Sequence, residues 1–415
     1  MKGIKVMGGI PLIGEVRIQG SKNAALPLMA AALLNKGTTI LHECPKIADV
    51  FVMEEILQLL GAETIWKDDT LEINAQFVTK TEVDEICGSK MRSSIILLGS
   101  LLGRFQEGTV PHPGGCVIGK RPIDLHLKVL QAMGTEILEE KDRIYAKTAA
   151  LKGCRIQFPF VSVGATQNAV LAAVLAEGDT VLEGCSKEPE VSWLCRFLNQ
   201  AGAKITGIGT DHIVISGVKA LHDVEFQVPK DRIAAGTYVC ASAITRGEGT
   251  LLDAPVEEMD ALLHAYKKIG GQYTYNSGKL TLCSFYADKP LANLQTQVYP
   301  GFPTDLQSVF MAVLTIANGM SRITENIFED RFKTVSPLQE MGADIVLDGN
   351  SARIYGAALT GKEVTAHELR GGAALIVAGL AARGETYVRN CGYIDRGYED
   401  ICRDLSMLGA QIYRD

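Results

Sequence analysis

The chain has 415 residues, more than one ordinary hydrophobic core accommodates, and its apolar fraction of 47% is ample for burial. Its net charge of -7 and pI near 5.6 leave no global positive field, so nucleic acid is excluded as an expected partner. The longest apolar run, Ala24 to Leu34, has eleven residues with a proline among them and is too short for membrane insertion.

Motifs that would indicate export or a cofactor are missing from the sequence. The first ten residues lack the apolar stretch of a signal peptide, so we expect a cytoplasmic protein. The ten cysteines form no C-x-x-C pair and the seven histidines no H-x-x-x-H spacing, so we expect no metal. A strand-anchored G-x-G-x-x-G and a G-x-x-x-x-G-K-[ST] loop are also missing, so we expect no nucleotide cofactor.

In chain order, the dominant feature is a sixfold repeat. An apolar helix ending in x-G-[AGT] and leading into a strand recurs at intervals of 73, 68, 68, 72 and 67 residues. Glycine suits the left-handed residue that ends such a helix. The six positions are Gly61, Gly134, Gly202, Gly270, Gly342 and Gly409.

A second, alanine-rich helix precedes another glycine in each repeat. These helices are apolar almost all round, so we expect them to be buried inside an α/β fold rather than at its surface. The runs end at Gly37, Gly108, Gly178, Gly247, Gly319 and Gly384.

The repeats divide into two domains of three. Lys22 to Pro229 supplies 208 residues and Lys230 to Asp415 only 186, but adding residues 1–21 brings the second set to 207. We therefore predict one domain over 22–229 and another over 1–21 plus 230–415. The crossings near Ser21 and Pro229 would form a hinge of the kind found in enzymes that close on substrate.

Polar residues gather where the alanine-rich helices begin, and several of these sets contain a cation. Single polar residues there are ordinary caps, but lysine and arginine are unfavourable at a helix N-terminus unless an anion lies close by. The sequence therefore predicts an anion-binding site lined from both domains. The sets are Ser21–Asn23, Arg92–Ser94, 162–166, Asp231–Arg232, Thr304–Asp305 and Arg370–Gly372; Arg121, Arg331 and Arg396 repeat the theme at the second helices.

Cys116 stands out among the thiols. It lies in P-G-G-C-V-I-G-K-R-P, with glycines before it, Lys120 and Arg121 after it, and a helix start at Pro122. Nearby cations and a helix N-terminus stabilise the thiolate, which is the reactive form. A buried cysteine in a glycine turn is the alternative.

Asp305, in G-F-P-T-D-L-Q, is the carboxylate that begins the fifth buried helix. An N-cap is the simple interpretation. Facing a hydroxyl substrate in a cation-rich region, it would instead act as a general base.

Taken together, these segments resemble the UDP-N-acetylglucosamine enolpyruvyl transferases over essentially the whole chain. The resemblance implies two inside-out α/β barrel domains of three repeats each, with buried helices. The motifs are G-S-K-N-A-A-L-P at Gly20, M-R-S-S at Met91, P-G-G-C-V-I-G-K-R-P-I-D-L-H at Pro113, V-S-V-G-A-T-Q-N at Val161, D-R-I-A-A-G-T at Asp231, F-P-T-D-L-Q at Phe302, I-T-E-N-I-F-E-D-R-F at Ile323 and Y-I-D-R-G-Y at Tyr393.

The resemblance implies transfer of the enolpyruvyl group of phosphoenolpyruvate to the 3-hydroxyl of UDP-N-acetylglucosamine, with release of phosphate, in peptidoglycan synthesis. Neither a metal nor an organic cofactor is implied, and the oligomeric state stays open. The catalytic residues would be Cys116, a proton donor and the residue alkylated by fosfomycin, with Asp305, Lys22 and Arg396. Phosphoenolpyruvate would contact Lys22, Arg121, Arg396, Arg370 and Asn23; the nucleotide sugar would contact Asn23, Arg92, Pro122, Ile123, Asp124, Leu125, Ser162, Val163, Gly164, Asp305 and Ile327, with Arg331 also in the binding set.

Two alternatives remain. A sister transferase acts on shikimate 3-phosphate but lacks the P-G-G-C loop. A non-catalytic paralogue would bind the nucleotide sugar but would be expected to have lost Cys116, Asp305 or an arginine. Phe160 departs from the family pattern, because some relatives carry a lysine there beside the nucleotide.

Overall fold

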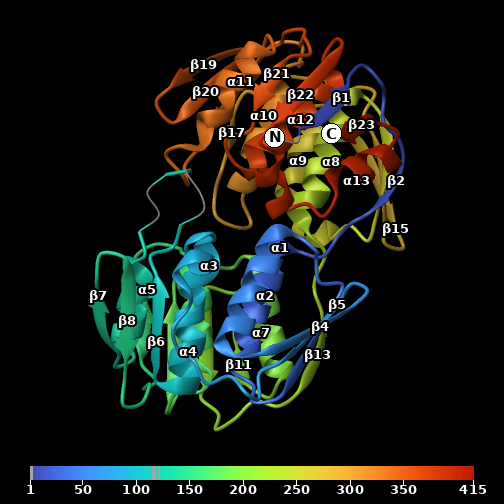
Figure 1. Cartoon of the computed structure of the whole chain (residues 1–415). Coiled ribbons are helices and arrows are strands. Elements are labelled where there is room, and N and C mark those ends of the chain that lie inside the picture. Colours follow the sequence, from blue (N-terminus) through green and yellow to red (C-terminus); the bar gives the residue numbers. More distant parts are fainter. Residues whose placement is uncertain (1–2, 115–117, 120–121) are drawn as a thin grey trace. The chain divides into compact units, whose positions relative to one another are not determined.

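The computed structural model describes residues 3–114, 118–119 and 122–415, and within these ranges the chain forms two compact units. Unit 1 takes residues 3–19, 118–119 and 230–415, and unit 2 takes residues 20–114 and 122–229. Figure 1 follows the chain through both. None of the helices in the described ranges is both long enough and apolar enough to cross a membrane.

The described residues of unit 2 form three sheets, whose strand orders are β13-β3-β5-β4, β6-β8-β7 and β9-β10-β12-β11. In each, the strand that follows a buried helix pairs antiparallel with the second strand of a hairpin. The strands are β3 (Thr38–His42), β4 (Glu63–Lys67), β5 (Thr70–Asn74), β6 (Glu107–Pro111), β7 (Glu136–Glu139), β8 (Arg143–Lys147), β9 (Arg155–Gln157), β10 (Asp179–Glu183), β11 (Lys204–Thr206), β12 (His212–Ser216) and β13 (Val224–Gln227).

Unit 1 repeats this topology in β2-β14-β16-β15, β17-β18-β20-β19 and β21-β22-β1-β23. The N-terminal strand β1 lies between β22 and β23, so it supplies the position that the second hairpin strand fills elsewhere. The strands are β1 (Ile4–Met7), β2 (Ile13–Arg17), β14 (Glu248–Leu252), β15 (Gln272–Asn276), β16 (Lys279–Cys283), β17 (Leu294–Gln295), β18 (Met320–Thr324), β19 (Asp344–Asp348), β20 (Ser351–Tyr355), β21 (Glu363–Thr365), β22 (Glu385–Arg389) and β23 (Gln411–Arg414).

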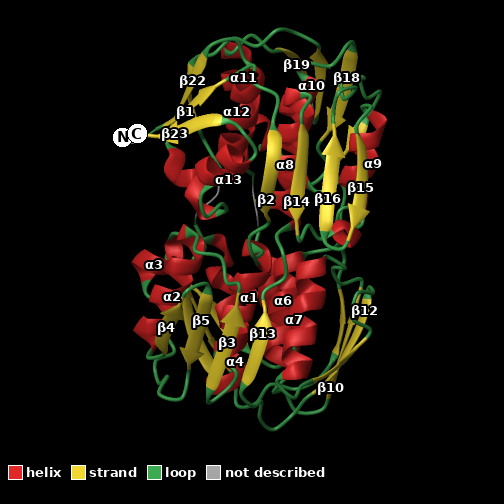
Figure 2. Cartoon of the chain, turned by 90° about the vertical axis from the view of Figure 1, so that its right-hand side faces the viewer, coloured by secondary structure: helices red, strands yellow, loops and turns green. Residues whose placement is uncertain are grey.

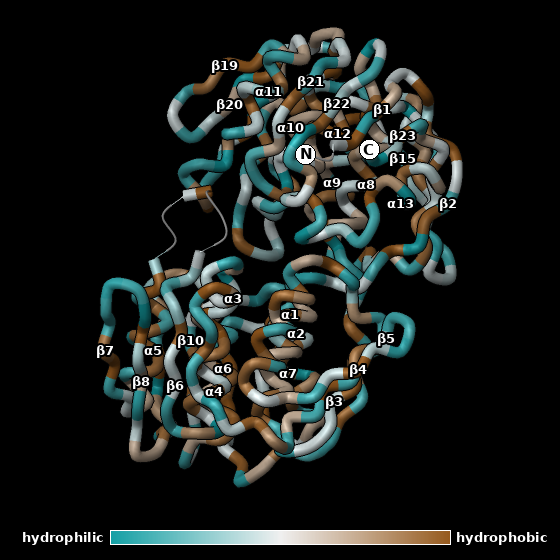
Figure 3. The backbone as a smooth tube through the Cα atoms, viewed as in Figure 1, coloured by the Kyte–Doolittle hydropathy of each residue, from teal (hydrophilic) through white to brown (hydrophobic). Residues whose placement is uncertain are grey.

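The six alanine-rich helices are buried, as their sequence predicts. All residues of α8 (Arg232–Thr245) are buried, and in unit 1 this helix packs against α10 (Gln307–Leu314) and α12 (Leu369–Ala381). The counterparts in unit 2 are α1 (Lys22–Ala32), α4 (Leu97–Phe105) and α6 (Val163–Ala173), of which α4 packs against both others. Figure 2 shows strands outside these helices in each unit, and Figure 3 shows apolar residues along them.

The outer helices end as the repeated glycines predict. All six glycines have positive φ, from 93° to 112°. The residue after each glycine donates its N–H to the carbonyl five residues earlier, as Ala62 N does to Leu57 O at 2.9 Å, which completes a Schellman motif. These helices are α2 (Ala48–Leu60), α5 (Asp124–Ala132), α7 (Pro189–Gln200), α9 (Asp260–Lys268), α11 (Val335–Glu340) and α13 (Ile401–Met407).

Short helical turns complete the chain. They are α3 (Glu85–Ser89) and the 3-10 turns η1 (Arg92–Ile96), η2 (Val256–Glu258), η3 (Thr304–Leu306), η4 (Arg331–Thr334) and η5 (Cys391–Arg396). Four of them hold candidate site residues: η1 and η3 come just before the buried helices α4 and α10, and η4 and η5 come before the outer helices α11 and α13.

The left-handed glycines should be measurable determinants of stability. At Gly134, φ is 93° and the nearest atom to an added Cβ lies 3.8 Å away, so alanine would meet strain but no clash. We expect Gly134→Ala to lower the free energy of unfolding by about 1 kcal/mol in urea denaturation. Gly392→Ala is the control, because that glycine has open space and no positive φ. Equal stability of the two variants would contradict this prediction.

Candidate functional site

The predicted site residues fall into two groups, one in each unit. In unit 1, Asp305 lies in η3 immediately before the buried helix α10. A Cβ on Gly236 of α8 would come within 2.5 Å of Leu306 Cδ1, so glycine allows α8 and the Asp305 turn to pack closely. The backbone that carries Asp305 is therefore fixed by core packing.

Two arginines hold the Asp305 carboxylate. Arg331 pairs through Nη2 with Asp305 Oδ1, and its Nε donates to Thr304 O at 3.2 Å. Arg370 Nη2 lies 3.2 Å from the other oxygen, Oδ2. Both arginine side chains are 2% exposed, whereas that of Asp305 is 30% exposed. The carboxylate is thus held by two buried cations and still reaches the surface of its unit.

Arg370 retains hydrogen-bonding capacity. Burial opposes its charge, but the carboxylates of Asp305 and Asp231 and the hydroxyl of Tyr398 outweigh that effect and raise the pKa of the guanidinium above its ordinary value. Its Nε and Nη1 find no acceptor among the residues that the structure describes. A buried charged group with unused donors is costly, which is typical of a site completed by an anion.

Two buried glutamates that sequence analysis did not single out support this group. Glu368 accepts from the N–H groups of Arg370 and Gly371 at the start of α12 and lies 3.7 Å from Arg331 Nη1. The sequence signal that could have identified Glu368 is its position two residues before an arginine at the start of a helix, where a carboxylate acts as an N-cap.

Glu325 is 3% exposed and ties together two turns that carry predicted site residues. Its carboxylate accepts from Thr304 Oγ1 at 3.0 Å and from the N–H groups of Ile327 and Phe328 at 2.8 and 3.1 Å. This fixes Ile327, a predicted nucleotide-sugar contact, relative to the Asp305 turn.

Arg396, the last unit 1 candidate, is half-buried at the end of η5. The next residues pass close to Arg370, because an added Cβ on Gly397 would lie 3.3 Å from Arg370 Nη1. Tyr398 is buried, with its ring 5.6 Å from Arg370 Cζ. Unit 1 therefore brings Asp305, Arg331 and Arg370 into contact and places the Arg396 segment beside them.

In unit 2, the cation at the start of α1 already has an anion. Lys22 Nζ lies 2.7 Å from Asp49 Oδ2, and the two side chains are 12% and 6% exposed. Asp49 is in the first turn of α2, where a carboxylate is favoured by the helix dipole. The anion that we predicted near Lys22 at the start of α1 is therefore, in this structure, the Asp49 carboxylate. Asn23 follows Lys22 in the first turn of α1.

The start of α6 carries the Ser162–Gly164 candidates. Ser162 is the N-cap and accepts from Ala165 N at 3.4 Å. An added Cβ on Gly164 would lie 2.9 Å from the ring of His126, which is buried and bonded to Asn168 Nδ2 at 3.1 Å. His126, within the P-I-D-L-H motif, and Asn168 were not predicted as site residues, but they fix α6 against α5 and α4.

The remaining candidates in unit 2 lie at two other helix starts. Arg92 begins η1, and Asp124 begins α5 with its carboxylate 3.3 Å from Lys128 Nζ. Pro122 is exposed, Ile123 is half-buried and Leu125 is buried. Cys116 and Arg121 lie outside the described residues, as does Lys120. Ile118, which lies between Cys116 and Lys120 in the sequence, accepts a hydrogen bond through its carbonyl oxygen from Asp330 N at 3.0 Å.

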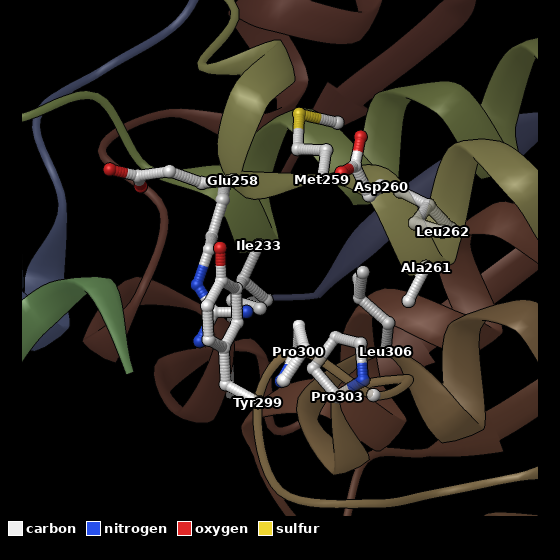
Figure 4. A pocket seen from close by; sticks show the side chains of 12 residues that line it. Ile233, Glu258, Met259, Asp260, Ala261, Leu262, Tyr299, Pro300, Pro303 and Leu306 are labelled. Atoms are coloured by element: carbon white, nitrogen blue, oxygen red, sulfur yellow. The ribbon is translucent and has the colours of Figure 1, made fainter. Parts of the chain in front are cut away.

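Two cavities in unit 1 have none of the residues predicted to contact substrate in their walls, although Arg232, from one of the polar helix starts, lines the first. One, of about 20 Å³, lies between the Tyr299–Pro303 loop, Ile233 and η2–α9, where Arg232 stacks 5.6 Å from the Tyr299 ring. Figure 4 shows Tyr299, Pro300 and Pro303 along one side of it. The other, of about 490 Å³, lies at the C-terminal ends of α8, α10 and α12.

Within the described ranges no group of three His, Cys, Asp or Glu side chains is arranged to hold a metal ion.

Several described thiols are poor nucleophiles. Burial raises the pKa of Cys87, Cys185, Cys391 and Cys402 to about 11 and that of Cys195 to about 12. Burial also raises the pKa of Cys154 and Cys240. These cysteines hold little thiolate near neutral pH.

Comparison with known proteins decides the family. The family model described as EPSP synthase (3-phosphoshikimate 1-carboxyvinyltransferase) matches residues 6–405. The chain belongs to this family. UDP-N-acetylglucosamine 1-carboxyvinyltransferase 2 of Caldanaerobacter subterraneus is 44% identical, covering 99% of both chains. UDP-N-acetylglucosamine 1-carboxyvinyltransferase of Halothermothrix orenii is 44% identical over 98% of both.

Solved structures of this family show the same fold. The enolpyruvyl transferase NikO from Streptomyces tendae superposes with a TM-score of 0.90 at 24% identity, covering 100% of this chain and 98% of that one. EPSP synthase from Acinetobacter baumannii gives 0.77 at 18% identity, covering 100% of both chains. The chain therefore has the α/β fold of the enolpyruvyl transferases.

The raised thiol pKa values sharpen the prediction for Cys116. At neutral pH, fosfomycin should add one mass increment to the peptide that holds Cys116, and Cys116→Ser should abolish it. Cys154→Ser and Cys283→Ser are matched controls because these cysteines are only half-buried, and neither should reduce labelling. Comparable labelling of several cysteines in the native protein, measured by mass spectrometry of peptides, would show that Cys116 is not the selective nucleophile.

Proposed function

We propose that this chain transfers the enolpyruvyl group of phosphoenolpyruvate to the 3-hydroxyl of UDP-N-acetylglucosamine and releases phosphate. The observation that carries the proposal is the 44% identity, over 99% of both chains, to a UDP-N-acetylglucosamine 1-carboxyvinyltransferase. A place in peptidoglycan synthesis and in the cytoplasm is part of the proposal.

In this reaction the sugar hydroxyl oxygen bonds to C2 of phosphoenolpyruvate while its C3 gains a proton. The resulting tetrahedral adduct then loses a proton from C3 and expels phosphate from C2, which restores the double bond. Asp305 accepts or orients the hydroxyl proton, and Cys116 supplies the proton to C3. Neither step consumes an oxidant or a metal-bound species.

The geometry of unit 1 supports the role of Asp305. A carboxylate held by Arg331 and Arg370 cannot rotate freely, and its 30% exposure leaves it accessible to a ligand. The hydrogen bonds from the two arginines fix the direction of the carboxylate, so much of its contribution is orientation of the hydroxyl. Arg331 therefore acts as a positioning residue, being 2% exposed and bonded to the Asp305 turn.

Cations hold phosphoenolpyruvate in this proposal. Lys22, Arg121 and Arg396 contact the substrate, and Arg370 lies near its carboxylate. Asp49 fixes the Lys22 ammonium at 2.7 Å, which sets where its charge is applied. Asn23, Arg92, residues 122–125, residues 162–164 and Ile327 receive the nucleotide sugar.

The proposal includes the finer architecture. Each unit is an inside-out barrel of three repeats, and the domains over 22–229 and over 1–21 plus 230–415 close about crossings near Ser21 and Pro229. In support, Ser21 N donates to Pro229 O at 2.7 Å and Asp231 N donates to Gln19 O at 2.9 Å, so the two crossings run side by side.

Phosphate release tests the activity directly. Inorganic phosphate should appear from phosphoenolpyruvate only when UDP-N-acetylglucosamine is present. Shikimate 3-phosphate is the control acceptor, because the matching family model is described by that chemistry. If phosphate is released from phosphoenolpyruvate with shikimate 3-phosphate but not with UDP-N-acetylglucosamine, the chain has the sister activity. Binding of the nucleotide sugar without phosphate release would indicate a non-catalytic paralogue.

Asp305 and Arg396 should separate chemistry from binding. Asp305→Asn should lower kcat by about 100-fold to 10,000-fold with little change in nucleotide-sugar affinity. Arg396→Ala should raise KM for phosphoenolpyruvate and leave nucleotide-sugar binding nearly intact. Asp344→Asn and Arg353→Ala, on exposed positions of β19 and β20, are matched controls and should turn over normally. Parental turnover by Asp305→Asn, or an unchanged phosphoenolpyruvate dependence of Arg396→Ala, would refute the assigned roles.

A further inference from the structure

Gln19 makes hydrogen bonds across a long sequence separation to the segment that carries Arg396. Its Nε2 donates to Gly397 O at 3.1 Å, and its Oε1 accepts from Glu399 N at 2.9 Å. The residue is 8% exposed, and its own carbonyl accepts from Asp231 N at 2.9 Å. One amide side chain thus satisfies a carbonyl and an N–H group on either side of Tyr398.

The side chain of Tyr398 holds the same segment through its hydroxyl group. Its hydroxyl lies 2.7 Å from Thr237 Oγ1 of α8, and Thr237 Oγ1 also bonds Ile233 O at 2.9 Å. The tyrosine is 1% exposed and lies beside the Arg370 guanidinium. Residues 397–399 are therefore held at the backbone by Gln19 and at the side chain by α8.

We propose that Gln19 is a positioning residue for Arg396. By fixing both neighbours of Tyr398, the amide sets where the backbone leaves η5 and hence where the Arg396 guanidinium is presented. Gln19 also precedes Lys22 by three residues, so one short segment is linked to two cations assigned to the same substrate. The inference rests on the proposed function, because phosphoenolpyruvate is the ligand of Arg396 in that proposal.

The chemistry of the contact requires an amide. The bond to Gly397 O needs a donor and the bond to Glu399 N needs an acceptor, and a neutral glutamine supplies both without adding a charge beside Arg396. A carboxylate would retain the second bond and oppose the first. An aliphatic side chain would leave both backbone groups without this partner, and the Gly397 carbonyl is in a buried contact.

Gln19→Met tests the proposal, because methionine keeps most of the volume and loses both hydrogen bonds. We expect KM for phosphoenolpyruvate to rise about tenfold while KM for UDP-N-acetylglucosamine stays within twofold. Gln19→Ala should act in the same direction. Gln339→Ala is the matched control in the same unit. Gln339, in α11, also donates through Nε2 to a backbone carbonyl, that of Ile345 in β19, at 2.8 Å, but among the described residues it makes no hydrogen bond to the segment that carries Arg396.

Two results would overturn the proposal: KM for phosphoenolpyruvate within twofold of the parent in Gln19→Met, or an equal rise in Gln339→Ala. Hydrogen exchange separates this failure from failure of the proposed function. Without any substrate, the Glu399 amide should exchange at least about tenfold faster in Gln19→Met than in the parent. If the parent released no phosphate, the proposed function would fail, and unchanged exchange at Glu399 would refute the positioning role by itself.

Discussion

The unit 1 site depends on burying two guanidinium groups beside carboxylates. An unpaired charge in a protein interior costs several kcal/mol, so Arg331 and Arg370, each 2% exposed, require the carboxylates around them. Asp305 pairs with both and Glu368 approaches Arg331, which gives the turn before α10 one favoured conformation. The same arrangement leaves Nε and Nη1 of Arg370 without an acceptor among the described residues.

The repeated fold explains why such charges meet. Each buried helix begins with groups that need hydrogen-bond partners, and the surrounding sheets place those beginnings at equivalent positions in a repeat. Different repeats satisfy the requirement differently: Ser21 and Ser162 cap with hydroxyls, whereas Asp231 and Glu368 cap with carboxylates. The repeat therefore places the helix starts at equivalent positions, and the residue type at each start decides whether a hydroxyl or a carboxylate caps it.

Much of this fold was predictable because its signals are local. The six left-handed glycines recur at nearly constant spacing, and each buried helix is apolar on all sides, so both features follow from short segments. The candidate residues of unit 1 were also predictable from motifs. The role of every candidate residue stays a prediction, and Cys116 and Arg121 also lie outside the described residues.

The partners of those residues were not predictable, since they come from distant segments. A cation at a helix start indicates a nearby anion but does not say whether a ligand or the protein provides it. For Lys22 the structure supplies Asp49, 27 residues away in sequence, at 2.7 Å, and for Arg370 it supplies Asp305, 65 residues away. Gln19 meets Gly397 across 378 residues, a contact that becomes visible only once β1 and β2 are seen to join the sheets of unit 1. Since the termini of the chain thereby complete the same unit, the residues that we propose to position Arg396 come from its first twenty residues as well as its last twenty.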